Sequence, residues 1–318
     1  MIVNYLGILA GLALLVYGAD RFVEGAAAIA RYLGMPPLLI GLTIVGIATS
    51  APEILVGVVA ALEGKTEIAI GNAIGSNIAN VGLVLGFTVM LMPVTITSPT
   101  LKREFIFMLP AIALAFGLLI DRNLSYIDAW ILLLGLAASI LAVIYLSRKS
   151  ARTDPLRNEF EIEIPERPNI GRSIFWFLLG LAFLLGGAYV LVECAVIVAK
   201  HFGLSDLIIG LTIIAIGTSL PELAASIMAV KKNEADIAIG NVIGSNMFNM
   251  LAVIGIPGMI HATDFDSVVL HRDFPVMIGM TLLMGYMVFI RGAGKFDRAE
   301  GSVLFLCFIA YQFWLFSG

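Results

Sequence analysis

Apolar residues along this chain fall into ten long runs that are separated by shorter polar segments. Most of these runs approach or exceed the roughly 20 residues that an α-helix needs to cross the hydrocarbon core of a bilayer. Alternation of apolar and polar residues with the period of a β-strand is absent, which argues against a membrane β-barrel. The pattern therefore predicts ten transmembrane helices, at residues 3–24, 38–62, 67–92, 103–120, 126–147, 173–199, 207–230, 236–260, 273–291 and 300–317.

One long polar stretch divides the predicted helices into five and five. We expect an N-terminal five-helix unit at residues 1–147, a linker at residues 148–172 and a C-terminal five-helix unit at residues 173–318. Lysine and arginine are enriched in cytoplasmic loops, and fourteen of them lie in the set of loops that includes the linker, against four in the other set. This places the linker in the cytoplasm and both termini outside, in a multi-pass protein of the cell membrane. Because five is odd, the two units are expected to be inverted repeats.

Composition agrees with a helical membrane protein and disfavours several other classes of function. Apolar residues make up 60% of the chain and charged residues 13%, with a mean hydropathy of +1.00, whereas ordinary globular chains carry about 25% charged residues. The first apolar run lacks a basic leader, so no signal peptide is expected. Glycines occur as helix-packing pairs and basic residues in loops, which predicts neither a phosphate loop nor a nucleic-acid partner. Nothing in the helices demands a protein partner or a cofactor.

A stretch at residues 41–86 occurs again at residues 210–255, without a gap and with almost half of the positions identical. Each copy holds a glutamate, Glu53 or Glu222, directly after a proline in an otherwise apolar run. Proline removes an amide donor and clashes with the preceding helical turn, so the helix should break around Ala48–Pro52. Such a break turns main-chain carbonyls away from the helix, where a cation can satisfy them but lipid cannot. We expect the second, third, seventh and eighth helices to be broken.

The two glutamates need a charge partner. An ionised carboxylate at the bilayer centre costs at least ~2.5 kcal/mol, and no lysine or arginine lies at residues 32–64 or 203–230. A purely structural role for the pair is therefore disfavoured. Glu53 and Glu222 are expected to hold cations or to carry protons.

Other oxygen donors repeat at helical spacing beside the glutamates. Thr49 shares a helix face with Glu53, and Ser76 shares one with Asn80, because residues four apart lie on the same side of a helix. A shell made of carboxylate, hydroxyl, amide and carbonyl oxygens suits calcium or sodium and disfavours zinc or copper. The converging side chains are Thr49, Ser50, Glu53, Ser76, Asn80, Thr218, Ser219, Glu222, Ser245 and Asn249. Four further asparagines, Asn72, Asn77, Asn241 and Asn246, are expected to hydrogen-bond the neighbouring broken helix.

The segments GIATSAPE and AIGTSLPE, each followed by a GNxIGSN segment, closely resemble the cation/calcium exchanger superfamily, in particular its prokaryotic sodium/calcium exchanger branch. The resemblance covers nearly the whole chain. It implies ten helices, alternating access, sliding of the first and sixth helices across a rigid eight-helix core, and a diamond of four cation sites. Carried over by position, it implies the ten side chains above as ligands, joined by the main-chain oxygens of Gly46 and Ala215.

One position departs from the family pattern. Many sodium/calcium exchangers carry an aspartate at the position of Asn249, whereas both halves of this chain carry asparagine. The formal charge of the site is then −2, which one Ca²⁺ or two monovalent cations neutralise. The leading hypothesis is an antiporter that exchanges Ca²⁺ for Na⁺. A Ca²⁺/H⁺ or other divalent-cation antiporter, participation of K⁺, and a cation channel stay open as alternatives.

An intramembrane enzyme is the remaining class. Ser76 or Ser245 would be its nucleophile, but no histidine or lysine base lies in the four motif helices. The sequence therefore predicts a transporter without enzymatic activity. Near the expected cytoplasmic end of the first helix, Asp20, Arg21 and Glu24 are interpreted as a charged cluster at the membrane surface.

Overall fold

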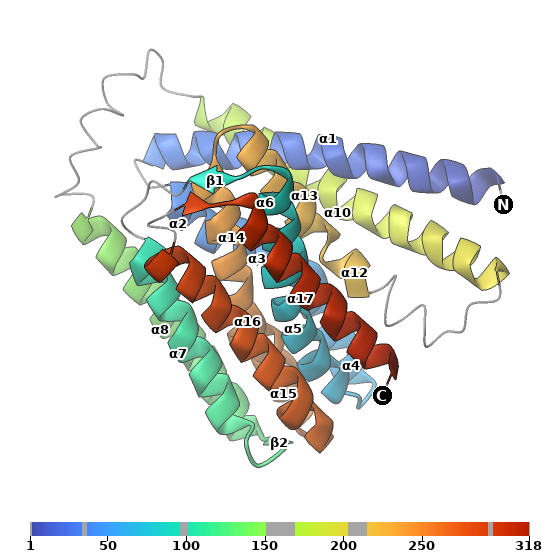
Figure 1. Ribbon diagram of the computed structural model, residues 1–318, viewed down its shortest axis with the longest axis vertical. Helices are drawn as coiled ribbons and strands as arrows, with labels where there is room; N and C mark the ends of the chain where they lie inside the picture. Colours follow the sequence, from blue (N-terminus) through green and yellow to red (C-terminus); the bar gives the residue numbers. More distant parts are fainter. Residues whose placement is uncertain are drawn as a thin grey trace.

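The computed structural model describes residues 2–33, 37–95, 101–150, 169–202, 215–291 and 295–317, and these residues are mostly helical (Figure 1). Most of the predicted linker, residues 151–168, lies outside the described residues, as does the start of the predicted seventh span at residues 207–214. Of the described helices, four are long and apolar enough to cross a membrane, and a bent pair makes a fifth.

The first half of the chain contains these elements in order: α1 (Ile2–Leu33), α2 (Pro37–Ile40), η1 (Gly41–Val45), α3 (Gly46–Thr49), α4 (Ala51–Leu62), α5 (Glu67–Ala79), η2 (Asn80–Gly86), α6 (Phe87–Leu91), β1 (Val94–Thr95), α7 (Leu101–Leu118), β2 (Asn123–Leu124) and α8 (Tyr126–Ser150), where η marks a π-helical segment. The second half contains α10 (Ile170–His201), α12 (Ala215–Thr218), α13 (Leu220–Lys231), α14 (Ala235–Phe248), η4 (Asn249–Val253), α15 (Gly255–Ile260), β3 (Thr263–Asp264), η5 (Val269–Asp273), α16 (Phe274–Tyr286), η6 (Met287–Arg291), β4 (Lys295–Phe296) and α17 (Arg298–Ser317).

Helices α1 and α10 pack antiparallel and lie across the ends of the other helices (Figure 1). Their contact is between backbones, because glycines of each helix meet the main chain of the other. A Cβ atom on Gly187 would lie 2.5 Å from the Leu15 nitrogen, and one on Gly11 would lie 2.7 Å from the Leu191 nitrogen. Small residues at such spacing let helices approach closely in a membrane. The two helices therefore form one tightly joined pair.

The prediction that the first helix ends near residue 24 was wrong, because α1 continues to Leu33. The charged residues that suggested an end are satisfied within the fold. Asp20 lies 2.9 Å from the Lys232 ammonium, and Glu24 lies 2.9 Å from the Arg21 guanidinium. Beyond this cluster, small apolar residues pack α1 against α13. The contact of Asp20 with Lys232 also joins α1 to the connection between α13 and α14.

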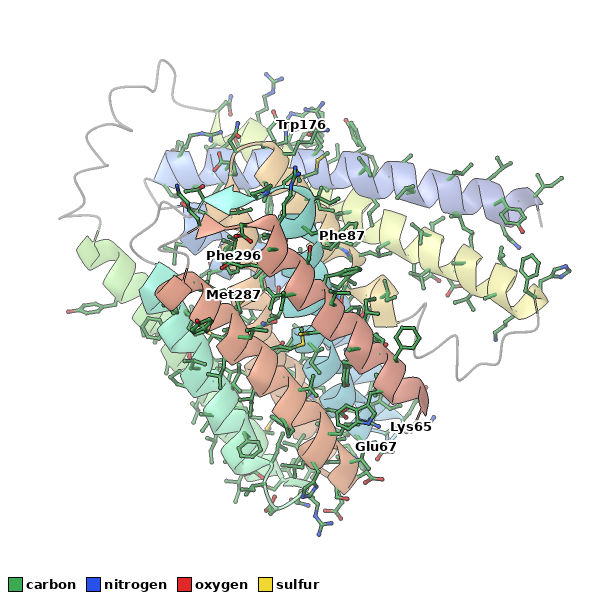
Figure 2. All side chains as sticks on the ribbon, in the orientation of Figure 1. Lys65, Glu67, Phe87, Trp176, Met287 and Phe296 are labelled. Carbon is green, nitrogen blue, oxygen red and sulfur yellow. The ribbon has the colours of Figure 1, made fainter. Side chains whose placement is uncertain are left out.

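The helices that carry the repeated motif form the centre of the molecule. The most apolar part of the Ala235–Ile260 helix is completely buried. The most apolar part of the Glu67–Leu91 helix is mostly buried. Helices α7, α8, α16 and α17 surround them (Figure 1). Lys65, in the connection between α4 and α5, and Glu67, the first residue of α5, lie at the far end of the molecule from Trp176 (Figure 2). The centre of the helices is thus left to the apolar core and the motif residues.

The predicted break at Pro52 is present, but the third and eighth helices are not broken. The helix Gly41–Thr49 bends by 47° into Ala51–Leu62, and Ser219 likewise interrupts the path between α12 and α13. In contrast, Glu67–Leu91 and Ala235–Ile260 each run continuously. No proline precedes their asparagines, and the chain instead widens into π-helical segments that begin at Asn80 and Asn249. Such segments are frequent at functional sites.

Two short antiparallel ribbons join the halves of the chain. Strand β1 pairs with β4, with Val94 opposite Phe296, and β2 pairs with β3, with Asn123 opposite Asp264. Each ribbon therefore takes one strand from each half. The β1 and β2 labels lie at opposite ends of the molecule (Figure 1). The ribbons fix the ends of the two halves against each other around the central motif helices.

The backbone contact between α1 and α10 gives a paired prediction. Gly187→Ala forces a methyl group into the α1 main chain, and we expect a loss of roughly 1–3 kcal/mol of stability by overpacking. Gly186→Ala is the control, because its Cβ position is exposed and has no described atom within 4 Å. Alanine there favours the helix by up to about 1 kcal/mol. Thermal unfolding of the purified protein in detergent measures both; equal melting temperatures would contradict the packing described.

Candidate cation-binding site

The break in the first half places Thr49, Ser50 and Glu53 around one turn. Ser50 leaves helical geometry with φ −80° and ψ 4°, and Glu53 lies in the first turn of α4. The Gly46 oxygen, which we expected to be freed, accepts hydrogen bonds from the Ser50 amide at 3.1 Å and the Thr49 hydroxyl at 3.4 Å. Pro52 instead deprives the Ala48 carbonyl of its helical donor. The break thus aims polar groups inward from both its side chains and its backbone.

The second half builds the same turn. Thr218 ends α12, Ser219 has φ −90° and ψ 3°, and Glu222 lies in the first turn of α13. Ala215 opens α12, so its main-chain oxygen lies one turn before the break. Thr218 is half-buried, whereas Ser219 and Glu222 are each only 1% exposed. The two breaks are therefore alike in local geometry.

Six oxygens of the expected ligands are buried and have no hydrogen-bond partner among the residues that the structure describes. A buried polar atom without a partner costs about 1–3 kcal/mol, so folded proteins rarely leave one. The six form three pairs at equivalent positions of the two repeats, so each half of the chain buries the same set of oxygen acceptors. They are the Oγ atoms of Ser50 and Ser219, the Oε2 atoms of Glu53 and Glu222, and the Oδ1 atoms of Asn80 and Asn249.

The two carboxylates belong to one site. Glu53 and Glu222 lie close enough for their charges to interact. Both glutamates are 1% exposed, and within the described part of the chain neither forms an ion pair with a lysine or arginine. Two like charges this close and this dry need to be neutralised, either by a bound cation or by protonation.

Thr49 ties the first break to the helix of the other half. Its hydroxyl donates to Asn241 Oδ1 at 3.0 Å and lies 3.5 Å from Ser245 Oγ. Both partners lie on α14, and both are fully buried. The expected bond between Asn241 and a broken helix is therefore present. Asn241 also donates to Ser226 of α13 at 3.4 Å, a partner that the sequence did not reveal.

Asn77 contradicts the expectation that it bonds a broken helix. Its amide nitrogen donates to the Asn246 main-chain oxygen at 3.1 Å, and its Oδ1 accepts from the Asn249 amide at 3.0 Å. Both contacts are with the unbroken helix of the other half. The physical reason is that α5 packs directly on α14 and η4. The repeated GSN segment indicated that Asn77 makes a buried hydrogen bond, but the sequence did not show which residue is its partner.

The donor set favours a hard cation. Across the described residues, no group of three or more histidine, cysteine, aspartate or glutamate side chains lies together. Thiolate or imidazole ligation of zinc or copper has no basis in these residues. Two carboxylates with neutral hydroxyl and amide oxygens match the shells that calcium and sodium accept. Ser76 and Ser245, 5% and 0% exposed, lie on the two helices that carry the asparagines.

Comparisons with known proteins agree with this chemistry. The family described as "Sodium/calcium exchanger protein" matches residues 3–145 and 172–317. The chain is 44% identical over 318 residues to "Putative antiporter CaxA" of Alkalimonas amylolytica, with 100% of each chain covered. It is 33% identical to "Sodium/calcium exchanger MaX1" of Methanosarcina acetivorans, with 99% of each covered. A solved structure of the sodium-calcium exchanger NCX_Mj superposes with a TM-score of 0.83 at 30% identity, covering 98% of this chain and 97% of that one.

The unpartnered oxygens give a prediction about cation binding. Ca²⁺ that binds only the folded protein stabilises it by about 2.7 kcal/mol at a hundredfold excess over Kd. This stabilisation raises the melting temperature. We expect Ser50→Ala to reduce this Ca²⁺-dependent shift, because it removes one ligand oxygen. Without Ca²⁺, loss of a buried unpartnered hydroxyl should leave stability equal or higher.

Thr281→Val is the matched control for Ser50→Ala. The Thr281 hydroxyl is also buried and lacks a partner among the described residues, but it lies on α16, outside the motif helices. Its replacement should leave the Ca²⁺-dependent shift unchanged. A full shift in Ser50→Ala, or an equal reduction in both variants, would contradict the site.

Proposed function

The chain belongs to the sodium/calcium exchanger family, and from this premise we propose that it exchanges Ca²⁺ for Na⁺ across the membrane through one shared cation site. As an exchanger of this family it is a multi-pass membrane transporter and not an enzyme. The observation that carries the proposal is the set of six buried, unpartnered oxygens around Glu53 and Glu222. Similarity to proteins named sodium/calcium exchangers supports the choice of ions.

Exchange follows from the charge of the site. With Asn80 and Asn249 neutral, the two glutamates give the site a formal charge of −2. Moving this charge through the membrane interior without a cation is costly, so the empty site stays facing one side until an ion binds. One Ca²⁺ or a pair of Na⁺ ions neutralises the same carboxylates. The two ions therefore compete, and a change of side requires one cargo or the other.

We also assign the ligands on this basis. Side-chain oxygens come from Thr49, Ser50, Glu53, Ser76 and Asn80 in the first half and from Thr218, Ser219, Glu222, Ser245 and Asn249 in the second. The main-chain oxygens of Gly46 and Ala215 join them. A carbonyl oxygen has two lone pairs, so the Gly46 oxygen keeps its bond to the Ser50 amide and coordinates with the other lone pair, while the Thr49 hydroxyl donates to Asn241 Oδ1 instead. The burial of the described members and their pairing between repeats support this set.

The proposed architecture has two inverted units of five spans, at residues 1–147 and 173–318. The linker at residues 148–172 lies in the cytoplasm and both termini lie outside, as the distribution of lysine and arginine indicates. Two observations support the inverted repeat: the matching turns at Ser50 and Ser219, and ribbons that each take one strand from either half. In this arrangement the cation site lies where the units meet, near the middle of the membrane.

Alternating access then needs a part that moves. The backbone-to-backbone contact of α1 with α10 makes this pair a single body. The pair also contacts η1, α3, α12 and α13, the elements that flank the two breaks. We propose that the pair shifts across the remaining helices and uncovers the site first from one side and then from the other.

The second candidate is a Ca²⁺/H⁺ antiporter. Glutamates that are buried without a basic partner among the described residues can release Ca²⁺ by taking up protons. The absence of an aspartate at position 249 is compatible with either counter-ion. The candidates differ only in what neutralises Glu53 and Glu222 on the return step.

Substitution of the glutamates tests the site. We expect Glu53→Gln or Glu222→Gln to reduce Ca²⁺ uptake into sodium-loaded proteoliposomes to the level of protein-free vesicles, because the site loses half of its charge. Glu300→Gln is the control, since Glu300 is equally buried at 2% exposure but caps α17 through the Asp297 amide. Its uptake should remain within about twofold of wild type, because glutamine can also cap a helix. Robust uptake by either site variant would count against the proposal.

Imposed gradients separate the counter-ions. In proteoliposomes of the wild-type protein, an outward Na⁺ gradient should drive ⁴⁵Ca²⁺ uptake and a pH gradient of equal size should not. Uptake driven by the pH gradient alone would select the Ca²⁺/H⁺ antiporter. Uptake that needs no counter-ion, with single-channel currents in planar bilayers, would select a cation channel.

A further inference from the structure

We propose that Asn77 is a positioning residue that holds the Asn249 carboxamide with its oxygen toward the cation site, and so fixes position 249 as a neutral ligand. The inference rests on the proposed function, because it assumes that Asn249 coordinates the transported ion. It adds to that function a residue that is itself no ligand. Asn77 lies on α5, in the opposite half of the chain from Asn249.

The contacts of Asn77 determine which way its own amide points. Its nitrogen lies 3.1 Å from the Asn246 main-chain oxygen and 3.5 Å from the Met277 sulfur. Both of these atoms are acceptors, so only the NH₂ end of the side chain can face them. The oxygen of Asn77 must then face the other way, toward Asn249. With Asn77 only 1% exposed, no bulk water competes for either end.

The orientation of Asn249 follows from that of Asn77. Because an amide oxygen faces it, Asn249 must present its NH₂ group, and the donor–acceptor distance is 3.0 Å. The Oδ1 atom of Asn249 then points away from Asn77. This oxygen is buried and has no partner among the described residues, like the carboxylate and hydroxyl oxygens of the site. The hydrogen bonds from Asn77 to the Asn246 carbonyl and to the Asn249 NH₂ group thus leave the Asn249 oxygen free to be a ligand.

This orientation decides whether Asn249 attracts or repels a cation. An amide carries an acceptor at one end and donors at the other, and only the oxygen end coordinates Ca²⁺ or Na⁺. A carboxylate at position 249 has no N–H to give, so it would set two acceptors against each other at the Asn77 oxygen. The arrangement around Asn77 therefore suits asparagine and keeps the charge of the site on Glu53 and Glu222.

The second repeat supplies an internal comparison. Asn246 is the repeat equivalent of Asn77, 169 residues further on, and is fully buried at 0% exposure. Neither its side-chain nitrogen nor its oxygen has a partner among the described residues. The Asn80 oxygen, the counterpart of that of Asn249, is buried without any such link to Asn246. The positioning device is thus present on one side of the site, through Asn77.

The experiment compares equivalent substitutions at the two positions. Full-length wild-type protein, Asn77→Leu and Asn246→Leu are purified in detergent. Ca²⁺ and Na⁺ binding are measured by calorimetry, together with the half-saturating Ca²⁺ concentration for uptake into proteoliposomes. We expect about a tenfold loss of cation affinity in Asn77→Leu, since a buried hydrogen bond that orients a ligand is removed. Asn246→Leu removes no bond and should stay within about twofold of wild type.

A conservative variant and a stability measurement separate positioning from general structural support. Asn77→Gln keeps both an N–H that can donate to the Asn246 carbonyl and an oxygen that can accept from the Asn249 amide, without adding charge, so it should retain more affinity than Asn77→Leu. The melting temperature without cations reports structural support. If Asn77→Leu unfolds, Asn77→Ala and Asn246→Ala make the same comparison with smaller side chains. Lower stability with unchanged cation affinity in the Asn77 variants would overturn the inference.

Two further results would overturn it in different ways. Equal losses of affinity at positions 77 and 246, in a wild-type protein that exchanges Ca²⁺ for Na⁺, would remove the inference and leave the proposed function intact. A wild-type protein that binds neither Ca²⁺ nor Na⁺ would remove both. A selective loss at position 77, partly restored by glutamine, is the result that supports it.

Discussion

The structure depends on how two buried negative charges are neutralised. Glu53 and Glu222 lie in the apolar centre of the molecule, come from opposite halves of the chain and face one site. No basic side chain among the described residues pairs with them. A charge removed from water without a partner destabilises the fold by more than most single contacts stabilise it. In the proposed function, a cation carried as cargo resolves this conflict.

The rest of the fold arranges ligands for that cation. Proline breaks the second and seventh predicted spans just before each glutamate, which exposes hydroxyl and carbonyl oxygens at the turn. The unbroken helices widen into π-helical segments that begin at Asn80 and Asn249, and both of these side chains are buried. Two ribbons, each shared between the halves, hold the ends of the molecule. The glycine-lined pair of α1 and α10 is packed against these breaks, which is where the proposed shift of the pair would change access to the site.

Features that depend on local sequence could be predicted. The run of apolar residues from Leu38 placed the second span, and Pro52 placed its bend at Ser50. The repeat of the motif paired Ser50 with Ser219 and Asn80 with Asn249, and the side-chain oxygens of these four residues are buried without a partner among the described residues. Local pattern was sufficient here because proline and buried polar groups act over one helical turn.

Features that depend on contacts between distant parts of the chain could not be predicted. Helix α1 continues past Glu24 to Leu33 because its last turns pack against α13, about two hundred residues later in the chain. The third and eighth spans were expected to break. They contain no proline before their asparagines and run continuously, with a π-helical segment in each. Asn77 was assigned to a broken helix, whereas its partners lie on α14 and η4 of the other half. In each case the deciding partner is supplied by the fold, and no spacing within the repeat identifies it.

The central claim is tested most directly by locating the ion itself. Crystals of the protein grown with Ca²⁺ can be measured for anomalous scattering. Calcium–oxygen distances in proteins are about 2.3–2.6 Å, so an anomalous peak at that distance from carboxylate oxygens of both Glu53 and Glu222 is the predicted result. A Ca²⁺ ion bound elsewhere, with the two carboxylates bridged by protein groups alone, would contradict it.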